Sequence, residues 1–423
     1  MSAKREFSDP TQFQIESLTI DGNDMTGMFL NISVYENIYI PCVTGEIMLL
    51  ETDGGEFMEK KEIEFTEEIE CSFTNALDER LEFKGKLNGV KNEQTKDSKR
   101  AYLIEFASGT VTKNESTFVT KRFKEETPQD IVKAMLEDKL GVEEVSLFAK
   151  GEPMNFVGSR RKPFDIIKYV CTHGVTSESK ATDNKQAYDE TTKGTTGFLC
   201  WETTAGYRFA TVDQLKKGEA GMEHKGYRKQ LAQRNVGMEQ AMKGVIDVTY
   251  PKMGNMQDKQ RAGAFCHKTV LFDMDKGYYK EYTYEADKKT ATDKQRAANA
   301  VPTRILTKTV SNERHNAECE AAQPDKGDAS RRYLGQNVVR QNTFDDQFGE
   351  FTLPPSFKMH AGDFIEFKIS KVKSEKEGGY DEKHSGRYII KGVAHHLYNN
   401  GTSYTRLSTI RTTTQQNDST SNK

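Results

Sequence analysis

The sequence predicts an α+β fold that is mainly β, with a β-rich unit at each end of the chain and smaller α+β material between them. Two observations carry this prediction. Short segments near both ends alternate apolar and polar residues with a period of two, and Gly, Asn and Asp interrupt them at turn-like spacing. Helix-capping signals gather in the middle of the chain instead.

The clearest β-rich segment runs from Phe344 to Arg411. Side chains alternate within Phe364–Ile369, and Asn399–Gly401 supplies the positive φ angles of a tight turn before a last strand at Tyr404–Ile410. We predict a four-stranded β-meander. A small sheet with two open edges needs partners, which can lie earlier in this chain, in a second copy of the same barrel-like fold or in neighbouring subunits.

A first all-β unit is predicted over residues 11–110, because short alternating runs are separated there by turn signals such as Asp21-Gly22. Regular short strands of this kind favour a sandwich or a barrel. The six expected strands are Phe13–Ile20, Phe29–Tyr35, Val43–Leu50, Ile63–Phe73, Leu81–Val90 and Ala101–Phe106.

The middle of the chain reads as a small α+β domain. One helix is expected from Thr127, which can cap it, through Pro128 to a stop at Gly141, and a second from Pro163 to Gly174. A hairpin follows over Phe198–Thr211. Between helix and hairpin, the polar, turn-rich residues 177–194 predict a loop.

The C-terminal meander supplies too few strands for a closed barrel, so we expect it to recruit a further strand at Gly244–Tyr250. Another strand is expected at Lys280–Tyr284, inside an insertion. The predicted domains are a first barrel at 1–115, the α+β domain at 116–225, a discontinuous second barrel at 226–255 with 336–412, an insertion at 256–335 and a disordered tail at 413–423.

Composition excludes several classes of protein. The 423 residues suggest two to four domains, and a net charge of -3 with a pI near 6.3 gives no basic field for specific nucleic-acid binding. The polar N-terminus and the lack of a long apolar run predict neither a secretion signal nor membrane insertion. Six scattered cysteines in a chain made in the cytoplasm predict reduced core thiols.

Motifs for catalysis, cofactor binding and metal binding are missing: the sequence has no His-Glu-x-x-His, Walker-type loop, Gly-x-Ser-x-Gly or Gly-x-Gly-x-x-Gly. We therefore expect no enzymatic activity, cofactor or metal. A hydrolase with a pair of catalytic carboxylates is the alternative, because the chain has many Asp and Glu residues from which such a pair could come. His395 and His396 are adjacent, so on a strand one points inward and one outward. Trp201 and the tyrosines at 278–284 could stack on sugars, but strand packing or an assembly surface explains them as well.

An acidic run lies inside the first unit. From Glu51 to Glu82 the sequence has twelve Asp or Glu and three Lys or Arg. Two interpretations are open: a solvated outer face, or a wall that repels a passing polyanion. For the second, the candidate acidic channel-lining residues are Glu62, Glu64, Glu67, Glu68, Glu70 and Glu82.

The order of these features resembles a known family. The N-terminal F-L-N-I-S-V-Y-E-N-I-Y-I-P-C-V-T-G-E-I-M-L-L, the capped helix F-K-E-E-T-P-Q-D-I-V-K-A-M-L, and the terminal A-G-D-F-I-E-F and S-G-R-Y-I-I-K-G-V-A-H-H-L are similar to the central baseplate hub protein of contractile-tailed, T-even-like bacteriophages. The likeness of order and pattern covers nearly the whole chain. The region 256–335 and the loop at 177–194 depart from that pattern, which leaves open where neighbouring baseplate parts dock.

The resemblance implies a fold and a set of partners. It implies two tube-like antiparallel β-barrels per chain, and a homotrimeric ring with pseudo-sixfold symmetry around a channel for DNA. One face would take the hexameric tail tube and the other the trimeric spike or cell-puncturing lysozyme, with baseplate wedge proteins around the ring and the virion tail as the location. Two alternatives remain at this stage: the spike base of a type VI-like contractile injection system, and a receptor- or glycan-binding tail protein.

Overall fold

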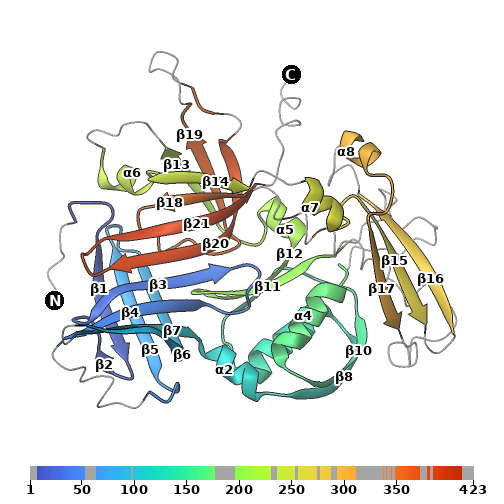
Figure 1. Ribbon diagram of the computed structural model, residues 1–423, viewed down its shortest axis with the longest axis horizontal. Coiled ribbons are helices and arrows are strands. Elements are labelled where there is room, and N and C mark those ends of the chain that lie inside the picture. The colour runs from blue at the N-terminus through green and yellow to red at the C-terminus, as the bar shows by residue number, and fades with distance from the viewer. Residues whose placement is uncertain are drawn as a thin grey trace.

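The computed structural model confirms the predicted class, since the fold is α+β and mainly β (Figure 1). Two β-units lie together on the left of Figure 1, an α+β domain lies at the lower right, and an inserted domain lies at the far right. The structure describes residues 7–52, 63–96, 99–176, 196–229, 236–252, 256–273, 277–286, 293–310, 348–371, 379–381 and 384–411, with 337, 340 and 344.

The first β-unit is a sheet with strand order β3-β4-β7-β6-β5-β1-β2, and every pair in it is antiparallel. Its buried face packs Ile32, Ile47, Phe73 and Tyr102 into one apolar core. The chain entering β3 bonds back to β1, where Met25 N–H donates to Leu18 O at 2.9 Å. The elements are β1 (Phe13–Ile20), β2 (Asn23–Asp24), β3 (Phe29–Asn37), β4 (Thr44–Thr52), β5 (Glu68–Asn75), β6 (Arg80–Lys96), β7 (Lys99–Ser108) and α2 (Gly109–Ser116).

The second β-unit has strand order β14-β18-β21-β20-β19-β13. The ring of strands closes between β13 and the chain entering β14, where Val245 N–H donates to Arg228 O at 2.9 Å. Gly401 adopts the expected positive φ, at 82°, in the turn before β21. The elements are β13 (Glu223–Lys229), α6 (Met238–Met242), β14 (Asp247–Lys252), β18 (Phe348–Leu353), β19 (Phe364–Ile369), β20 (Gly386–Tyr398) and β21 (Ser403–Arg411).

The predicted β-meander is wrong in one respect. In a meander each strand pairs with the next one in sequence, but β18 pairs with β21 and not with β19. Residues 354–363 carry the chain from β18 across to β19. Alternation and turn residues predict strands and tight hairpins, whereas a longer connection leaves the position of the next strand undetermined.

The two β-units share one sheet of thirteen strands. The C-terminal part of β20 pairs antiparallel with β3, from Gly392 opposite Asn37 to Tyr398 opposite Asn31. The N-terminal part of β20 pairs with β19, so one long strand serves both units. The edge of the C-terminal sheet was expected to pair earlier in the chain, with a second copy of the fold, or with another subunit. At β20 the partner is β3, which lies earlier in the same chain.

The two β-units also repeat one arrangement. The order β3-β4-β7-β6-β5 in the first unit corresponds to β14-β18-β21-β20-β19 in the second, and the strands occur in the same sequence along the chain. All four neighbouring pairs are antiparallel in both units. The sixth strands differ, because β1 is antiparallel to β5 while β13 is parallel to β19.

The α+β domain follows the expected order of helices and hairpin. Thr127 caps the first helix by accepting from Asp130 N–H, and the last turns of that helix are a π-helix, η1. Strand β13 crosses the boundary expected at residue 225. The elements are β8 (Val119–Glu126), α3 (Pro128–Ala134), η1 (Met135–Lys139), β9 (Val145–Leu147), β10 (Met154–Arg161), α4 (Pro163–His173), β11 (Phe198–Thr203), β12 (Gly206–Thr211) and α5 (Val212–Lys217).

The inserted domain lies in the connection between β14 and β18. It contains a three-stranded sheet of order β16-β15-β17. Its elements are α7 (Met256–Arg261), β15 (Cys266–Asp273), β16 (Tyr278–Glu285), α8 (Asp293–Ala298) and β17 (Arg304–Val310). The loop expected at 177–194 and the tail at 413–423 lie outside the described residues. Among the helices of the described part, none is long and apolar enough to cross a membrane.

Candidate functional site: a buried polar junction

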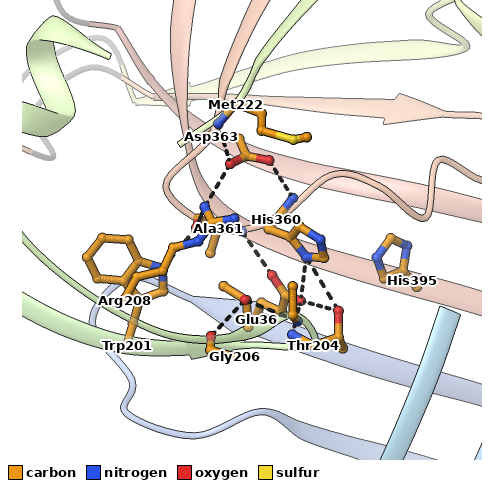
Figure 2. Close-up of polar contacts among 12 residues, drawn as sticks. Glu36, Trp201, Thr204, Gly206, Arg208, Met222, His360, Ala361, Asp363 and His395 are labelled. Atoms are coloured by element: carbon orange, nitrogen blue, oxygen red, sulfur yellow. Dashed lines mark hydrogen bonds and ion pairs between the residues drawn. The ribbon is translucent and has the colours of Figure 1, made fainter. Parts of the chain in front are cut away.

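Polar side chains, most of them charged and all buried or partly buried, meet where the two β-units and the α+β domain join (Figure 2). We call this group the junction cluster: Glu36, Thr204, Arg208, His360 and Asp363. The first unit supplies Glu36 from β3, the hairpin β11–β12 supplies Thr204 and Arg208, and the approach to β19 supplies the other two. The cluster therefore connects three parts of the fold.

Glu36 is held by donors from the hairpin and from the loop that precedes β19. Its side chain accepts from the backbone N–H and the hydroxyl of Thr204 at 2.7 and 2.9 Å, and from Ala361 N–H at 2.9 Å. His360 Nδ1 lies 3.2 Å from the same carboxylate. With only 2% of its surface exposed, Glu36 depends on these donors in place of water.

Asp363 is fully buried and holds the second unit to the hairpin. Its carboxylate accepts from Arg208 Nη1 at 2.7 Å and from Met222 N–H at 3.0 Å, and His224 Nε2 lies 3.0 Å away. The backbone N–H of His360 donates to it at 3.1 Å. Because Met222 and His224 flank the start of β13, one carboxylate fixes how that strand enters the second β-unit.

Trp201 packs against the same loop. Its indole N–H donates to Ala361 O at 2.8 Å, and its side chain is fully buried. Gly362 has a φ of +91°, and a Cβ there would lie 2.5 Å from the Trp201 ring. Only glycine fits this position, since both the backbone conformation and the ring exclude a side chain.

The pKa values favour the charged forms within the cluster. Burial alone would raise the pKa of Glu36, but hydrogen bonding and the charge of His360, with the Thr204 and Ala361 N–H donors, bring it below its usual value. For Asp363, burial is likewise outweighed by His224 and Arg208, so its pKa is lowered. Burial opposes protonation of His360, yet Glu36 raises the His360 pKa. The cluster thus holds paired opposite charges.

A second contact clamps the connection between β3 and β4. Glu202 accepts from Val43 N–H at 2.8 Å, and the Tyr207 hydroxyl donates to Pro41 O at 2.8 Å. Burial raises the pKa of Glu202 to about 7. The hairpin β11–β12 therefore holds the first unit through one carboxyl and the second unit through another.

The chemistry of the junction is that of a clamp. The carboxylates of Glu36 and Asp363 are each engaged by several donors, which leaves neither placed to act as a base or nucleophile. Among the described residues, no group of three His, Cys, Asp or Glu side chains is arranged to hold a metal ion. The arrangement fixes the relative positions of the domains.

No protein-family model and no curated protein matches this chain. The chain shares its fold with two tail proteins. One is the tail protein from Neisseria meningitidis MC58, with a TM-score of 0.54 and 8% identity, covering 95% of this chain and 97% of that one. The other is the 43 kDa tail protein of prophage MuSo2 from Shewanella oneidensis, with a TM-score of 0.52 and 12% identity, covering 94% and 98%.

These likenesses show that the fold matches over nearly the whole length of all three chains. A weaker likeness, with a TM-score of 0.46 and 9% identity, is to the c3393 protein of E. coli, described as a component of the type VI secretion system; it covers 96% of this chain and 77% of that one. At identities this low, a shared fold is not a shared activity.

The candidate acidic channel-lining residues are only partly brought together. Glu68 and Glu70 are exposed on β5, and Glu82 is exposed on β6. Lys84 lies 3.1 and 2.6 Å from the carboxylates of Glu68 and Glu70, so this face carries mixed charge. Arg80 lies 3.7 Å from Glu82.

The other three acidic candidates differ from this group. Glu67 is buried, which removes it from any exposed wall, and its carboxylate accepts from Glu64 N–H at 2.8 Å. Glu64 itself is exposed, and Glu62 lies outside the described residues. The alternation along β5 places Ile69 and Cys71 inward, and the same period of two extends back to Glu67, just before the strand, which is buried as well.

Other sequence predictions are resolved by the structure. His395 is buried, with Nδ1 3.0 Å from Thr405 Oγ1, and His396 is half-buried on the opposite face, as expected for neighbours on a strand. Trp201 has a packing role and presents no surface to a sugar. Of the tyrosines at 278–284, Tyr279 is exposed. Five cysteines are free thiols, four of them buried, and Cys319 lies outside the described residues.

Sequence reasoning missed the junction cluster. Two signals for it were present. Glu36 follows Val34 at the inward-facing spacing of a strand, where an acid must find a partner. His360 and Asp363 flank Gly362 directly before an apolar strand, which places charge at a buried strand entry. Neither signal identifies the partners, because Thr204 lies 168 residues from Glu36 and Arg208 lies 155 residues from Asp363.

Proposed function

We propose that this chain is a structural, non-enzymatic component of a contractile tail, the central hub of its baseplate. One observation carries the proposal. A single chain holds two copies of one β-arrangement, joined in one sheet, on a fold shared along nearly its whole length with two tail proteins. The chain would be made in the host cytoplasm and become part of the virion tail.

The strand order supports assembly into a ring. Eight strands follow one another as β14-β18-β21-β20-β3-β4-β7-β6, each antiparallel to the next. Within the described residues, the outer edge of β14 and the C-terminal part of β6 on its β5 side have no strand partner along their length. Open edges of this kind pair readily with another chain. Three chains would then place six similar units around one axis.

This arrangement would match a threefold spike to a sixfold tube. Two units of one chain imitate two subunits of a hexameric ring, so the homotrimer could accept the tail tube on one side and the trimeric spike or cell-puncturing lysozyme on the other. Baseplate wedge proteins would contact the outside. The junction cluster serves this role, because quasi-equivalent positions require that the two units keep a fixed relation to each other.

A channel for DNA would run along the axis. The sheet face opposite the first core is polar across the joint, with Glu46, Ser33, His396 and Tyr404 in one row. The exposed acids Glu68, Glu70 and Glu82 would also repel DNA if they face the channel. If reversal of these three charges leaves DNA ejection unchanged, they are not part of the channel wall.

Electron microscopy of the purified chain, alone and with candidate spike protein from the same source, tests the hub directly. We expect rings with a central channel, with six similar densities in projection and three chains per ring. Particles that show single chains in both samples would contradict the proposal.

A further inference from the structure

The α+β domain contains a two-stranded ribbon, β8 paired with β10, which lies at the lower right of Figure 1, on the side away from the first β-unit. One face of the ribbon packs on the core of the domain, where the rings of Phe123 and Phe156 stack with their centroids 4.5 Å apart. In the part of the chain that the structure describes, no third strand pairs with β8 or β10. The outer edge of each strand is therefore open to pairing with another strand.

The face of the ribbon opposite this core carries cations and apolar side chains. Phe118, Thr120 and Arg122 are exposed at the two-residue spacing of side chains on one face of a strand, and Lys124 is exposed beyond them. Phe118, just before β8, is 54% exposed. Val157 pairs with Arg122 on β10 and is 45% exposed. A partner for this face has to complement both positive charge and apolar surface.

A bulge in β10 brings a further cation to Phe118. The register of β8 and β10 shifts between Gly158 and Arg161, and within this bulge Arg160 takes a positive φ of 48°. The N–H of Arg160 donates to Thr120 Oγ1 at 3.3 Å, and its guanidinium lies 5.4 Å from the centre of the Phe118 ring. Bulges re-aim side chains in this way, and a positive φ at a residue other than glycine is strained. The backbone therefore holds Arg160 against an exposed aromatic ring.

The ribbon is positive in a chain that is negative overall. Strands β8 and β10 together contain five Lys or Arg and two Glu, whereas the net charge of the chain is -3. Glu126 is paired with Lys121 of the same strand at 2.9 Å. Glu125 is exposed near the end of β8, and its N–H donates to Asn155 Oδ1 at 2.7 Å. The excess of positive charge favours an anionic partner.

The charge on this edge selects what can pair with it. Cationic side chains discourage pairing with another copy of the same ribbon, because like charges directly opposite each other destabilise a strand pair. A strand with acidic side chains at every second position would place carboxylates beside Arg122 and Lys124 instead. We propose that the β8–β10 ribbon binds an extended acidic segment of a partner protein, which adds a strand to the open edge of β8. This inference goes beyond the proposed hub function and uses none of the strands of the ring.

Fluorescence anisotropy of the full-length protein with a labelled peptide, Glu-Val-Glu-Val-Glu-Val-Glu-Val, tests the inference. We expect binding that weakens with added salt, and none for the matching peptide of alternating Lys and Val. Arg122→Glu and Arg160→Glu, each alone, should weaken binding about tenfold, because an attraction becomes a repulsion. Lys133→Glu, at an exposed cation of α3 in the same domain, is the matched control and should bind as wild type does. Thermal unfolding of each variant confirms that the fold is intact.

A second peptide separates strand pairing from charge attraction. The same acidic sequence, N-methylated at every residue, keeps its carboxylates and has no N–H to donate, so it should not bind. Equal binding of the methylated and unmethylated peptides overturns the added strand. Failure of the unmethylated acidic peptide to bind, or equal binding by Arg122→Glu, Arg160→Glu and wild type, also overturns the proposal. Each of these results leaves the hub as it stands, because the ring is tested by its mass and not by this ribbon.

Discussion

The two β-units of this chain have the same five-strand arrangement and close it in different ways. In the first unit the closing strand β1 is antiparallel to β5 and leads through the short β2 hairpin into β3. In the second unit the closing strand β13 is parallel to β19 and arrives from the α+β domain. The same sheet can thus be completed by a local strand or by one from a distant part of the chain.

Because of this difference, the two units are stabilised by different kinds of interaction. The first unit is completed within its own sequence and is held by a large apolar core. The second unit needs Asp363 to fix the start of β13 and Arg208 to fix Asp363. We therefore expect the second unit to depend more on buried charge and the first more on packing.

The largest effect is expected from Asp363→Asn. The change leaves Arg208 and His224 without their buried counter-charge, and breaking a buried pair in this way costs about 3–5 kcal/mol of unfolding free energy. Urea denaturation measures the loss. The control Asp247→Asn changes an exposed acid of the same unit and should stay within about 0.5 kcal/mol. Equal stability of both variants would contradict the dependence on buried charge.

The two carboxyl clamps should respond to pH in opposite directions. The folded-state pKa of Glu202, about 7, lies above its unfolded value, so the folded state binds more protons and Glu202 lowers stability as pH rises from about 4.5 to 7. The change is about 3 kcal/mol across that range. Asp363 has a lowered pKa, so its stabilisation is present above its unfolded pKa and is lost as pH falls through the folded value.

Unfolding free energies of wild type and Glu202→Gln across pH 4 to 8 check this prediction. The variant keeps the shape of the side chain and cannot titrate, so the decline between pH 4.5 and 7 should flatten. If the unfolding free energy of Glu202→Gln declines with pH as steeply as that of wild type, burial does not raise the pKa of Glu202 and the prediction is wrong.

A smaller effect is expected from Gly45→Ala in the first unit. A Cβ at Gly45 would lie 2.5 Å from the backbone carbonyl of Ser33 and would also meet the Phe106 ring. Overpacking of this kind costs about 1–3 kcal/mol. Thermal or urea unfolding measures it. Gly89→Ala is the matched control, because its Cβ makes an ordinary 3.4 Å contact with Glu105; a similar loss in both would show that packing at Gly45 is not special.

The smallest effect is expected from Lys84→Ala. This lysine pairs with Glu68 and Glu70 across the exposed face of β5 and β6, where solvent screens the interaction. The unfolding midpoint should not shift measurably. A clear destabilisation would mean that the face is covered by something other than solvent in the assembled protein, which would sharpen the search for the channel wall.

Local signals predicted the elements, and long-range contacts decided the rest. Alternation gave the strands at Phe364–Ile369, and capping signals gave the helix start at Thr127. The position of β18 beside β21 could not be predicted, because residues 354–363 allow several crossings. The junction cluster was also missed, because Glu36 and His360 come together only after both units have formed.

The solution mass of the purified full-length chain, measured by light scattering alone and with candidate spike protein from the same source, tests the central claim most directly. Three chains of 48.0 kDa have a mass of about 144 kDa. The hub predicts this mass for the chain alone, or this mass plus that of the spike protein for the complex. A stable mass of one chain in both samples would contradict the ring and, with it, the role proposed for the repeated β-units.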